Sequence, residues 1–226
     1  MKTDDKILRW NTIHAFLFCF LFILYAIFPV RYPVIVVAAL SFLYYWLIHF
    51  DLLKRFKPFG GYPNWVTLIR LILILGSGIW YKHIPDFGLI VVGLVFFSLD
   101  GLDGLLARKF NQKSEFGAYF DLETDAIYVC VFTIILFEKG LAGFWIVVPG
   151  FMRYIYGVLI FIIGKKGDEE TAVKYAPQIG ALFFVAILFP YILPGKLYYP
   201  LLIISSVLLM LSFLYSFIRV LRIKTV

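Results

Sequence analysis

The stretch Ser98–Ile127 reads SLDGLDGLLARKFNQKSEFGAYFDLETDAI. It places Asp100, Asp103, Asp121 and Asp125 in two segments that are otherwise apolar enough to cross a bilayer. An ionised carboxylate deep in a membrane helix costs roughly 2.5–3.5 kcal/mol on insertion scales, so four would cost on the order of 10 kcal/mol if uncompensated. The stretch itself carries too little positive charge to pair them, and divalent cations are the natural counter-charge. We therefore interpret this stretch as a metal-binding active site held by a membrane scaffold.

Composition indicates a membrane protein. Of the 226 residues, 62% are hydrophobic and only 15% are charged, whereas soluble domains carry about 25% charged residues. The formal net charge of +7 could suggest nucleic acid as a partner. The basic residues, however, cluster at the ends of apolar runs, where they would meet anionic lipid head groups. We expect membrane lipids and no nucleic acid as partners.

Eight apolar segments each have about the length needed to span a bilayer as a helix. They cover residues 14–30, 34–50, 64–81, 86–108, 117–137, 141–163, 176–193 and 198–218. The first has a basic flank like a signal peptide but no small-residue cleavage site, so we interpret it as a retained helix. Cys19 and Cys130 lie inside apolar runs and are interpreted as packing residues.

The predicted fold is an all-α polytopic membrane protein. We expect two N-terminal transmembrane helices in residues 1–50 and a juxtamembrane segment in 51–63. That segment, DLLKRFKPFGG in its first part, is either an amphipathic interfacial helix or a basic loop. Residues 64–226 would then form a six-helix domain.

The distribution of Lys and Arg predicts the orientation. Fifteen lie on one side of the predicted segments and four on the other, while Arg70 and Arg153 lie within segments and complete the 21. The fifteen are Lys2, Lys6, Arg9, Lys54, Arg55, Lys57, Arg108, Lys109, Lys113, Lys165, Lys166, Lys174, Arg219, Arg222 and Lys224; the four are Arg31, Lys82, Lys139 and Lys196. By the positive-inside rule, both termini are expected in the cytoplasm.

This orientation predicts that the aspartates lie at the same depth. Asp100 and Asp103 are spaced i,i+3 and Asp121 and Asp125 i,i+4, so each pair shares one helix face. At 1.5 Å per residue, both pairs would lie roughly 6–12 Å in from the cytoplasmic membrane face. The link of residues 109–116 is short enough to make the two helices antiparallel neighbours. We therefore expect the four carboxylates to converge.

The fixed residues of the stretch form the pattern D-x2-D-G-x2-A-R-x8-G-x3-D-x3-D. They are Asp100, Asp103, Gly104, Ala107, Arg108, Gly117, Asp121 and Asp125. This pattern resembles the complete signature of the CDP-alcohol phosphatidyltransferase family. The family core has six transmembrane helices with the signature in the second and third. Segments 64–218 would supply the same number, so the first two segments look like an addition to that core.

The resemblance implies a chemistry for the acidic residues. Family members attack the β-phosphorus of a CDP-linked alcohol with a second alcohol and release CMP. By resemblance, Asp100, Asp103, Asp121 and Asp125 hold Mg²⁺ or Mn²⁺, with two ions expected, because carboxylate oxygens suit these hard cations. Asp125 is also the implied general base for the attacking hydroxyl.

The resemblance also implies a nucleotide pocket. Gly104, Ala107 and Gly117 would leave room for the nucleotide, and Arg108 would pair with a phosphate. On residue type alone, the small residues could equally mark helix–helix contacts, and Arg108 could be an ordinary cytoplasmic flank.

Further residues outside the signature are predicted to line the site. Asn64, Thr67 and Arg70 form P-N-x-x-T-x-x-R, which resembles the family's entry to its first core helix and implies nucleotide contact. Arg153, an arginine inside a span, is expected to contact an anionic acceptor or lipid phosphate, or else to pair with a motif aspartate. Lys174 is a further candidate for the acceptor site. Glu123 falls on the wrong helix face for the site.

We interpret the chain as a phospholipid-synthesising transferase that moves a phosphatidyl group from CDP-diacylglycerol to a small polar alcohol. The acceptor cannot be read from the pattern, although Arg153 favours an acidic one. An alternative is the reverse arrangement, in which CDP-choline or CDP-ethanolamine is the donor and diacylglycerol the acceptor. An alternative of another class is a divalent-cation transporter using the same carboxylates. The resemblance further implies a homodimer.

Overall fold

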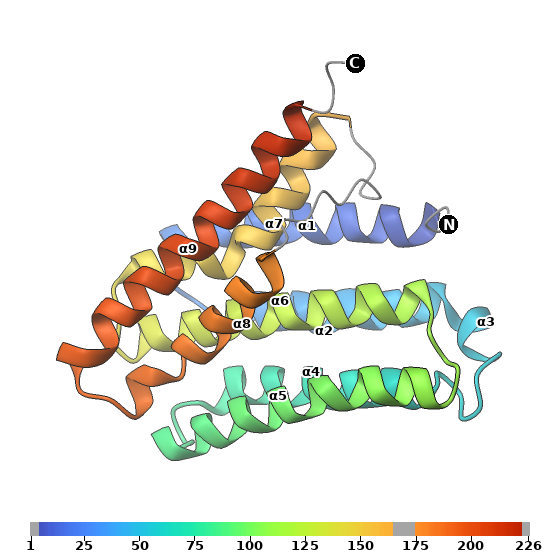
Figure 1. Ribbon diagram of the computed structural model, residues 1–226, viewed down its shortest axis with the longest axis horizontal. Helices are drawn as coiled ribbons and strands as arrows, with labels where there is room; N and C mark the ends of the chain where they lie inside the picture. Colours follow the sequence, from blue (N-terminus) through green and yellow to red (C-terminus); the bar gives the residue numbers. More distant parts are fainter. Residues whose placement is uncertain (1–4, 165–174, 223–226) are drawn as a thin grey trace.

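The structure, a computed structural model, describes residues 5–164 and 175–222, and within these ranges every regular element is a helix (Figure 1). The α-helices are α1 (Asp5–Ile27), α2 (Tyr32–Ile48), α3 (Phe50–Leu53), α4 (Tyr62–Trp80), α5 (Asp86–Lys109), α6 (Glu115–Glu138), α7 (Val147–Ile162), α8 (Ala176–Ala186) and α9 (Gly195–Arg222). Two short 3₁₀ helices are η1 (Phe144–Ile146) and η2 (Phe189–Tyr191). The chain is an all-α polytopic membrane protein, as predicted.

Five of the described helices are long and apolar enough to cross a membrane. They are Asp5–Ile27, Tyr62–Trp80, Asp86–Lys109, Phe144–Ile162 and Gly195–Arg222. α2 is slightly shorter at 17 residues, and α6 has the length but carries the acidic residues of the motif.

The predicted span at 176–193 is corrected by the structure. α8 has only 11 residues, which corresponds to about 17 Å of helix, and η2 follows it. Pro190 has no backbone N–H and disfavours helical geometry in the residue before it, so it prevents a straight continuation of α8. This part of the chain is a short helix and a 3₁₀ turn rather than one regular span.

The juxtamembrane segment is a folded loop, and the amphipathic helix is limited to the four residues of α3. Gly60 and Gly61 both have φ near +80°, which glycine adopts without strain. The Gln112 side chain ties this loop to the α5–α6 link, because its Nε2 donates to the Lys57 carbonyl and its Oε1 accepts from the Tyr62 N–H. Of the two sequence interpretations, the basic loop is the correct one.

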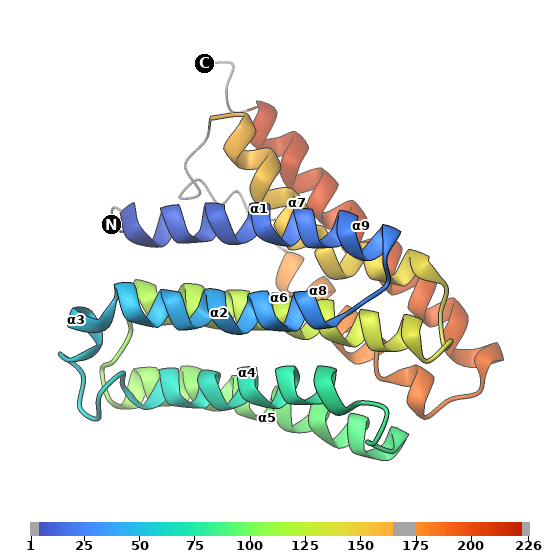
Figure 2. The ribbon, with the colours of Figure 1, turned by 180° about the vertical axis from the view of Figure 1, so that it is seen from behind.

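α4 and α6 form the centre of the helix arrangement. α4 packs against both α5 and α6, and α7 packs against both α6 and α1 (Figures 1 and 2). Every residue from 126 to 136 of α6 is buried. α5 and α6 are neighbours, as expected, and touch through side chains, since the rings of Phe96 and Tyr128 stack with their centroids 4.4 Å apart. The closer backbone packing joins each of the two helices to α4. The two aspartate-bearing helices are therefore held side by side through α4.

A buried ion pair joins the N-terminal helices to the core at the end of α6. Arg31, in the α1–α2 loop, donates through Nη1 to the Glu138 carboxylate at 2.9 Å and through Nε to the Gly78 carbonyl at 2.8 Å. The hydroxyls of Tyr25 and Tyr81 also donate to Glu138. α1, α4 and α6 are thus tied together at this end by one carboxylate.

Candidate active site

The aspartates of the motif come together as the helix periodicity predicts. Asp100 and Asp103 are on α5, and Asp121 and Asp125 are on α6. One carboxylate oxygen from each of Asp100, Asp103 and Asp121 can be chosen so that all three lie within 4.8 Å of one another. Asp125 is joined to this group through a shared arginine.

That arginine is Arg70 of α4, whose guanidinium contacts all four carboxylates. Its Nη2 lies 2.8 Å from Asp100 Oδ1 and 2.6 Å from Asp125 Oδ1. Its Nη1 lies 2.9 Å from Asp103 Oδ2 and 2.5 Å from Asp121 Oδ1. Because α4 packs on both α5 and α6, its side chain reaches carboxylates on both helices. The four aspartates therefore share one buried counter-ion that lies outside the signature.

The surroundings fix Arg70 in this position. The side chain is fully buried, and its guanidinium carbon lies 4.2 Å from the centroid of the Phe96 ring, a cation–π contact. Sequence reasoning placed Arg70 in the nucleotide pocket, whereas the structure places it among the carboxylates. Its position within an apolar helix was the available signal, since an intramembrane arginine requires an anionic partner.

The carboxylates retain the character of a divalent-cation site despite Arg70. One guanidinium balances only one of four carboxylate charges, and the oxygen donors are those that Mg²⁺ and Mn²⁺ prefer. The side chains of Asp100 and Asp121 are 46% and 37% exposed, while that of Asp103 is 9% exposed. The donor set therefore fits a divalent ion that reaches it from the exposed side.

Thr67 and Asn64 support this arrangement from α4. The Thr67 hydroxyl lies 3.2 Å from both Asp103 Oδ2 and the Pro63 carbonyl, and its one proton can be donated to either. Asn64, interpreted from sequence as a nucleotide contact, is buried and donates to the Gly60 carbonyl at 2.7 Å. A Cβ on Gly117 would lie 2.7 Å from Asn64 Oδ1, so Gly117 lets α4 approach α6 closely.

Gly104, Ala107 and Arg108 remain available to a ligand. Among the residues that the structure describes, a Cβ on Gly104 would meet only the tip of Arg108, at 3.9 Å, so no helix contact within this part of the chain explains the glycine. Arg108 is exposed and Ala107 is half-buried in the last turns of α5. Their predicted contact with a nucleotide stays a prediction, as does the metal-binding role of each aspartate.

The two predicted acceptor-site residues do not join the aspartates. Arg153 of α7 donates to Glu123 of α6 through Nε at 3.1 Å and through Nη2 at 2.8 Å, so its predicted pairing with a motif aspartate is wrong. Its predicted contact with an anionic acceptor or lipid phosphate stays a prediction. Glu123, set aside in the sequence analysis, is buried and has Arg153 as its partner. Lys174 lies outside the described residues.

Comparison with known proteins points to one family. The family model for CDP-alcohol phosphatidyltransferase matches residues 61–218, so α1 to α3 lie outside the match. The chain is 30% identical over 151 residues to ethanolaminephosphotransferase 1 of Homo sapiens, covering 58% of this chain and 38% of that protein. It is 31% identical over 134 residues to CDP-diacylglycerol--glycerol-3-phosphate 3-phosphatidyltransferase of Yersinia pestis (strain Pestoides F), covering 53% of this chain and 73% of that one. No solved structure matches the chain.

Replacement of Arg70 tests the counter-ion arrangement. In Arg70→Gln the four carboxylates lose their shared cation, and removing one partner of a buried ion pair costs about 3–5 kcal/mol, less here because two of the aspartates are partly exposed. We expect a lower melting temperature in EDTA and a larger stabilisation by Mg²⁺ than in the wild type, measured by thermal unfolding in detergent.

Arg31→Gln is the matched control, because it breaks a buried pair far from the aspartates. It should lower the melting temperature without changing the response to Mg²⁺. An Arg70→Gln protein as stable in EDTA as the wild type would contradict the proposed role of Arg70.

Proposed function

Since the chain belongs to the CDP-alcohol phosphatidyltransferase family, we propose that it transfers a substituted phosphate from a CDP-linked alcohol to a second alcohol and releases CMP. The observation that carries the proposal is the approach of Asp100, Asp103 and Asp121 from two helices to within 4.8 Å. Oxygen donors at this spacing suit hard cations that neutralise a diphosphate.

The residues of the site have distinct roles in the proposed reaction. The hydroxyl oxygen of the acceptor bonds to the β-phosphorus of the donor, the bond to the CMP oxygen breaks, and Asp125 accepts the hydroxyl proton. Arg70 holds the four carboxylates close to one another by contacting each of them, and Thr67 orients Asp103 through its 3.2 Å hydrogen bond. Arg108, at the end of α5, pairs with a donor phosphate. Divalent cations, when bound, neutralise the diphosphate and the leaving group.

Our first choice of substrates is CDP-diacylglycerol as donor and a small polar alcohol as acceptor. The bacterial relative, whose name states this type of reaction, supports that choice. The human relative supports the second candidate, in which a CDP-linked amino alcohol is the donor and diacylglycerol the acceptor. The chain spans only 38% of that human protein. Both relatives are named as transferases, so the cation-transporter alternative gains no support.

The excess of Lys and Arg on one side supports a cytoplasmic location for both termini and for the site. The homodimer implied by the resemblance stays a prediction.

A panel of substrates tests the proposed reaction. Purified protein with Mg²⁺ should release CMP from CDP-diacylglycerol in the presence of one radiolabelled acceptor among glycerol phosphate, inositol phosphate, serine and choline. CMP release from CDP-ethanolamine or CDP-choline with diacylglycerol, and none from CDP-diacylglycerol, would establish the second candidate. Absence of CMP release from every pair would reject the proposed function.

Asp125→Asn tests the general base. An amide cannot accept the hydroxyl proton, so we expect CMP release to fall on the order of 10²–10⁴-fold, while the protein stays folded and binds CDP-diacylglycerol. Asp51→Asn, the same change at a side chain that is 96% exposed, should leave turnover unchanged. Unchanged turnover in Asp125→Asn would remove this residue as the base.

A further inference from the structure

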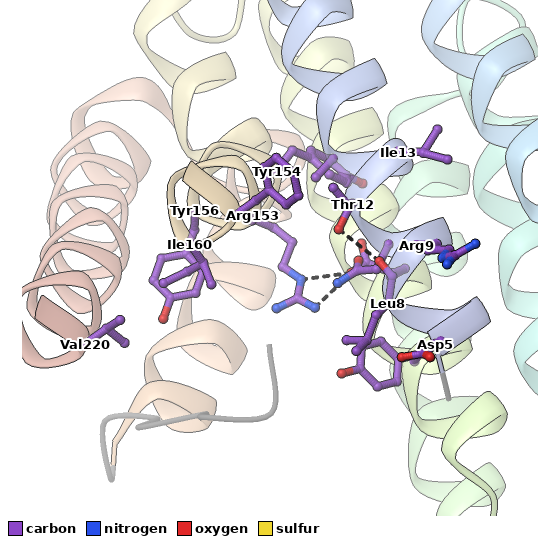
Figure 3. Close-up of a pocket in the computed structure, with 16 residues that line it drawn as sticks. Asp5, Leu8, Arg9, Thr12, Ile13, Arg153, Tyr154, Tyr156, Ile160 and Val220 are labelled. Carbon is purple, nitrogen blue, oxygen red and sulfur yellow. Dashed lines mark hydrogen bonds and ion pairs between the residues drawn. The ribbon is translucent and has the colours of Figure 1, made fainter. Parts of the chain in front are cut away.

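A second polar site lies in a cavity of about 490 Å³ between α1, α6, α7 and α9 (Figure 3). Leu8 and Thr12 of α1 form one wall, and Tyr156 and Ile160 of α7 with Val220 of α9 form the opposite one. None of the four motif aspartates lines this cavity. Because α1 lies outside the region that matches the family model, the family-matched core alone does not enclose it.

The helix geometry of α6 places this cavity away from the aspartate site. At about 100° per residue, Glu123 points opposite to the mean direction of Asp121 and Asp125. Glu123 lines the cavity together with Arg153, whose side chain extends into the space between α7 and α1 in Figure 3. One helix therefore presents aspartates to the proposed active site on one face and a glutamate to this cavity on the other.

Two buried polar atoms of the cavity lining have no hydrogen-bond partner among the described residues. Glu123 uses Oε1 to accept both bonds from Arg153, which leaves Oε2 buried and unpartnered. The hydroxyl of Tyr154, a residue that is 1% exposed, is also unpartnered. Buried polar atoms in folded proteins are nearly always satisfied, so Glu123 Oε2 calls for a hydrogen-bond donor, while the Tyr154 hydroxyl can donate or accept.

Charge restricts the ligand further. The charged side chains that line the cavity are Asp5, Arg9, Glu123 and Arg153, whose formal charges sum to zero, so a ligand of net charge would add an uncompensated charge there. A zwitterionic ligand avoids this, since its cationic donor can reach Glu123 Oε2 while its anionic group lies near Arg153. The aromatic and aliphatic wall of Tyr156, Ile160 and Val220 suits an apolar continuation of such a ligand. The volume is within the usual range for small-molecule sites.

We propose that this cavity binds a zwitterionic phospholipid whose head group carries a primary amine, with the ammonium donating to Glu123 and the phosphate facing Arg153. Its glycerol backbone and first methylene groups lie against α7 and α9. The proposal is independent of the reaction at the aspartates, and its test measures no turnover.

Native mass spectrometry of the delipidated, full-length protein in detergent tests the proposal by titration with defined lipids. Dioleoyl phosphatidylethanolamine should bind about tenfold more tightly than dioleoyl phosphatidylcholine, because a trimethylated ammonium cannot donate a hydrogen bond to the carboxylate. Phosphatidylglycerol, with net negative charge, should also bind more weakly. Glycerophosphoethanolamine, which has the same head group and no acyl chains, should not compete at equal concentration.

Two variants assign the binding to this cavity. Glu123→Gln should lose the preference for the primary amine, and Ile160→Trp should fill the cavity and weaken phosphatidylethanolamine binding at least tenfold while leaving the ion pair intact. Asp86→Asn, which breaks the Asp86–Lys139 pair elsewhere, should bind like the wild type. If Glu123→Gln does not fold, Ile160→Trp decides the question alone.

The proposal is overturned if the wild type binds phosphatidylethanolamine no better than phosphatidylcholine, or binds phosphatidylglycerol more tightly than either. If glycerophosphoethanolamine competes with phosphatidylethanolamine at equal concentration, the claim that the ligand is a lipid rather than a free head group is wrong. If Ile160→Trp binds phosphatidylethanolamine with the affinity and the selectivity of the wild type, the lipid binds elsewhere and the proposed site is wrong.

Discussion

The contact of Arg70 with four carboxylates is the interaction on which the proposed active site depends. Without a shared cation, aspartates facing each other from α5 and α6 would repel, and their burial within apolar helices would be costly. The guanidinium contacts each of them within 3 Å and is itself held by Phe96. α4 is thus more than a packing helix, because it supplies the charge that lets α5 and α6 present their acidic faces to the same space. The partial exposure of Asp100 and Asp121 leaves that space accessible to cations and to a nucleotide diphosphate.

α6 connects this site to the rest of the molecule. Its aspartate face meets Arg70, its opposite face meets Arg153 through Glu123, and its C-terminal end meets Arg31 through Glu138. Three arginines from three different parts of the chain therefore neutralise acidic residues of one helix. One of the three contacts, that with Arg31, comes from the loop between the N-terminal helices, and α1 forms one wall of the cavity beside Arg153. This gives the N-terminal helices a physical role: α1 and α2 pack against the core, and α1 closes a polar cavity that the family-matched region does not close by itself.

Sequence alone predicted the helical membrane fold and the grouping of the aspartates, because both follow from local periodicity. The i,i+3 and i,i+4 spacings fix which residues share a helix face, and apolar length predicts spans.

Features that depend on packing between distant segments were not predictable in the same way. Arg70 lies 30 residues before Asp100 in the sequence, and only the packing of α4 on both motif helices shows that it is their counter-ion. The Glu123–Arg153 pair was missed for a related reason, since the two residues lie 30 positions apart and only the packing of α7 on α6 brings them together. The α8 region was predicted as a span because hydropathy does not register the effect of Pro190 on the backbone.

The central claim is that Asp100, Asp103 and Asp121 hold divalent cations in a group organised by Arg70. Diffraction from crystals soaked in Mn²⁺, recorded at a wavelength where manganese scatters anomalously, tests it most directly. The account predicts anomalous peaks at about 2.0–2.6 Å from carboxylate oxygens of these three residues. The claim would be contradicted if, at saturating Mn²⁺, the metal bound only at other sites and Arg70 still contacted all four aspartates.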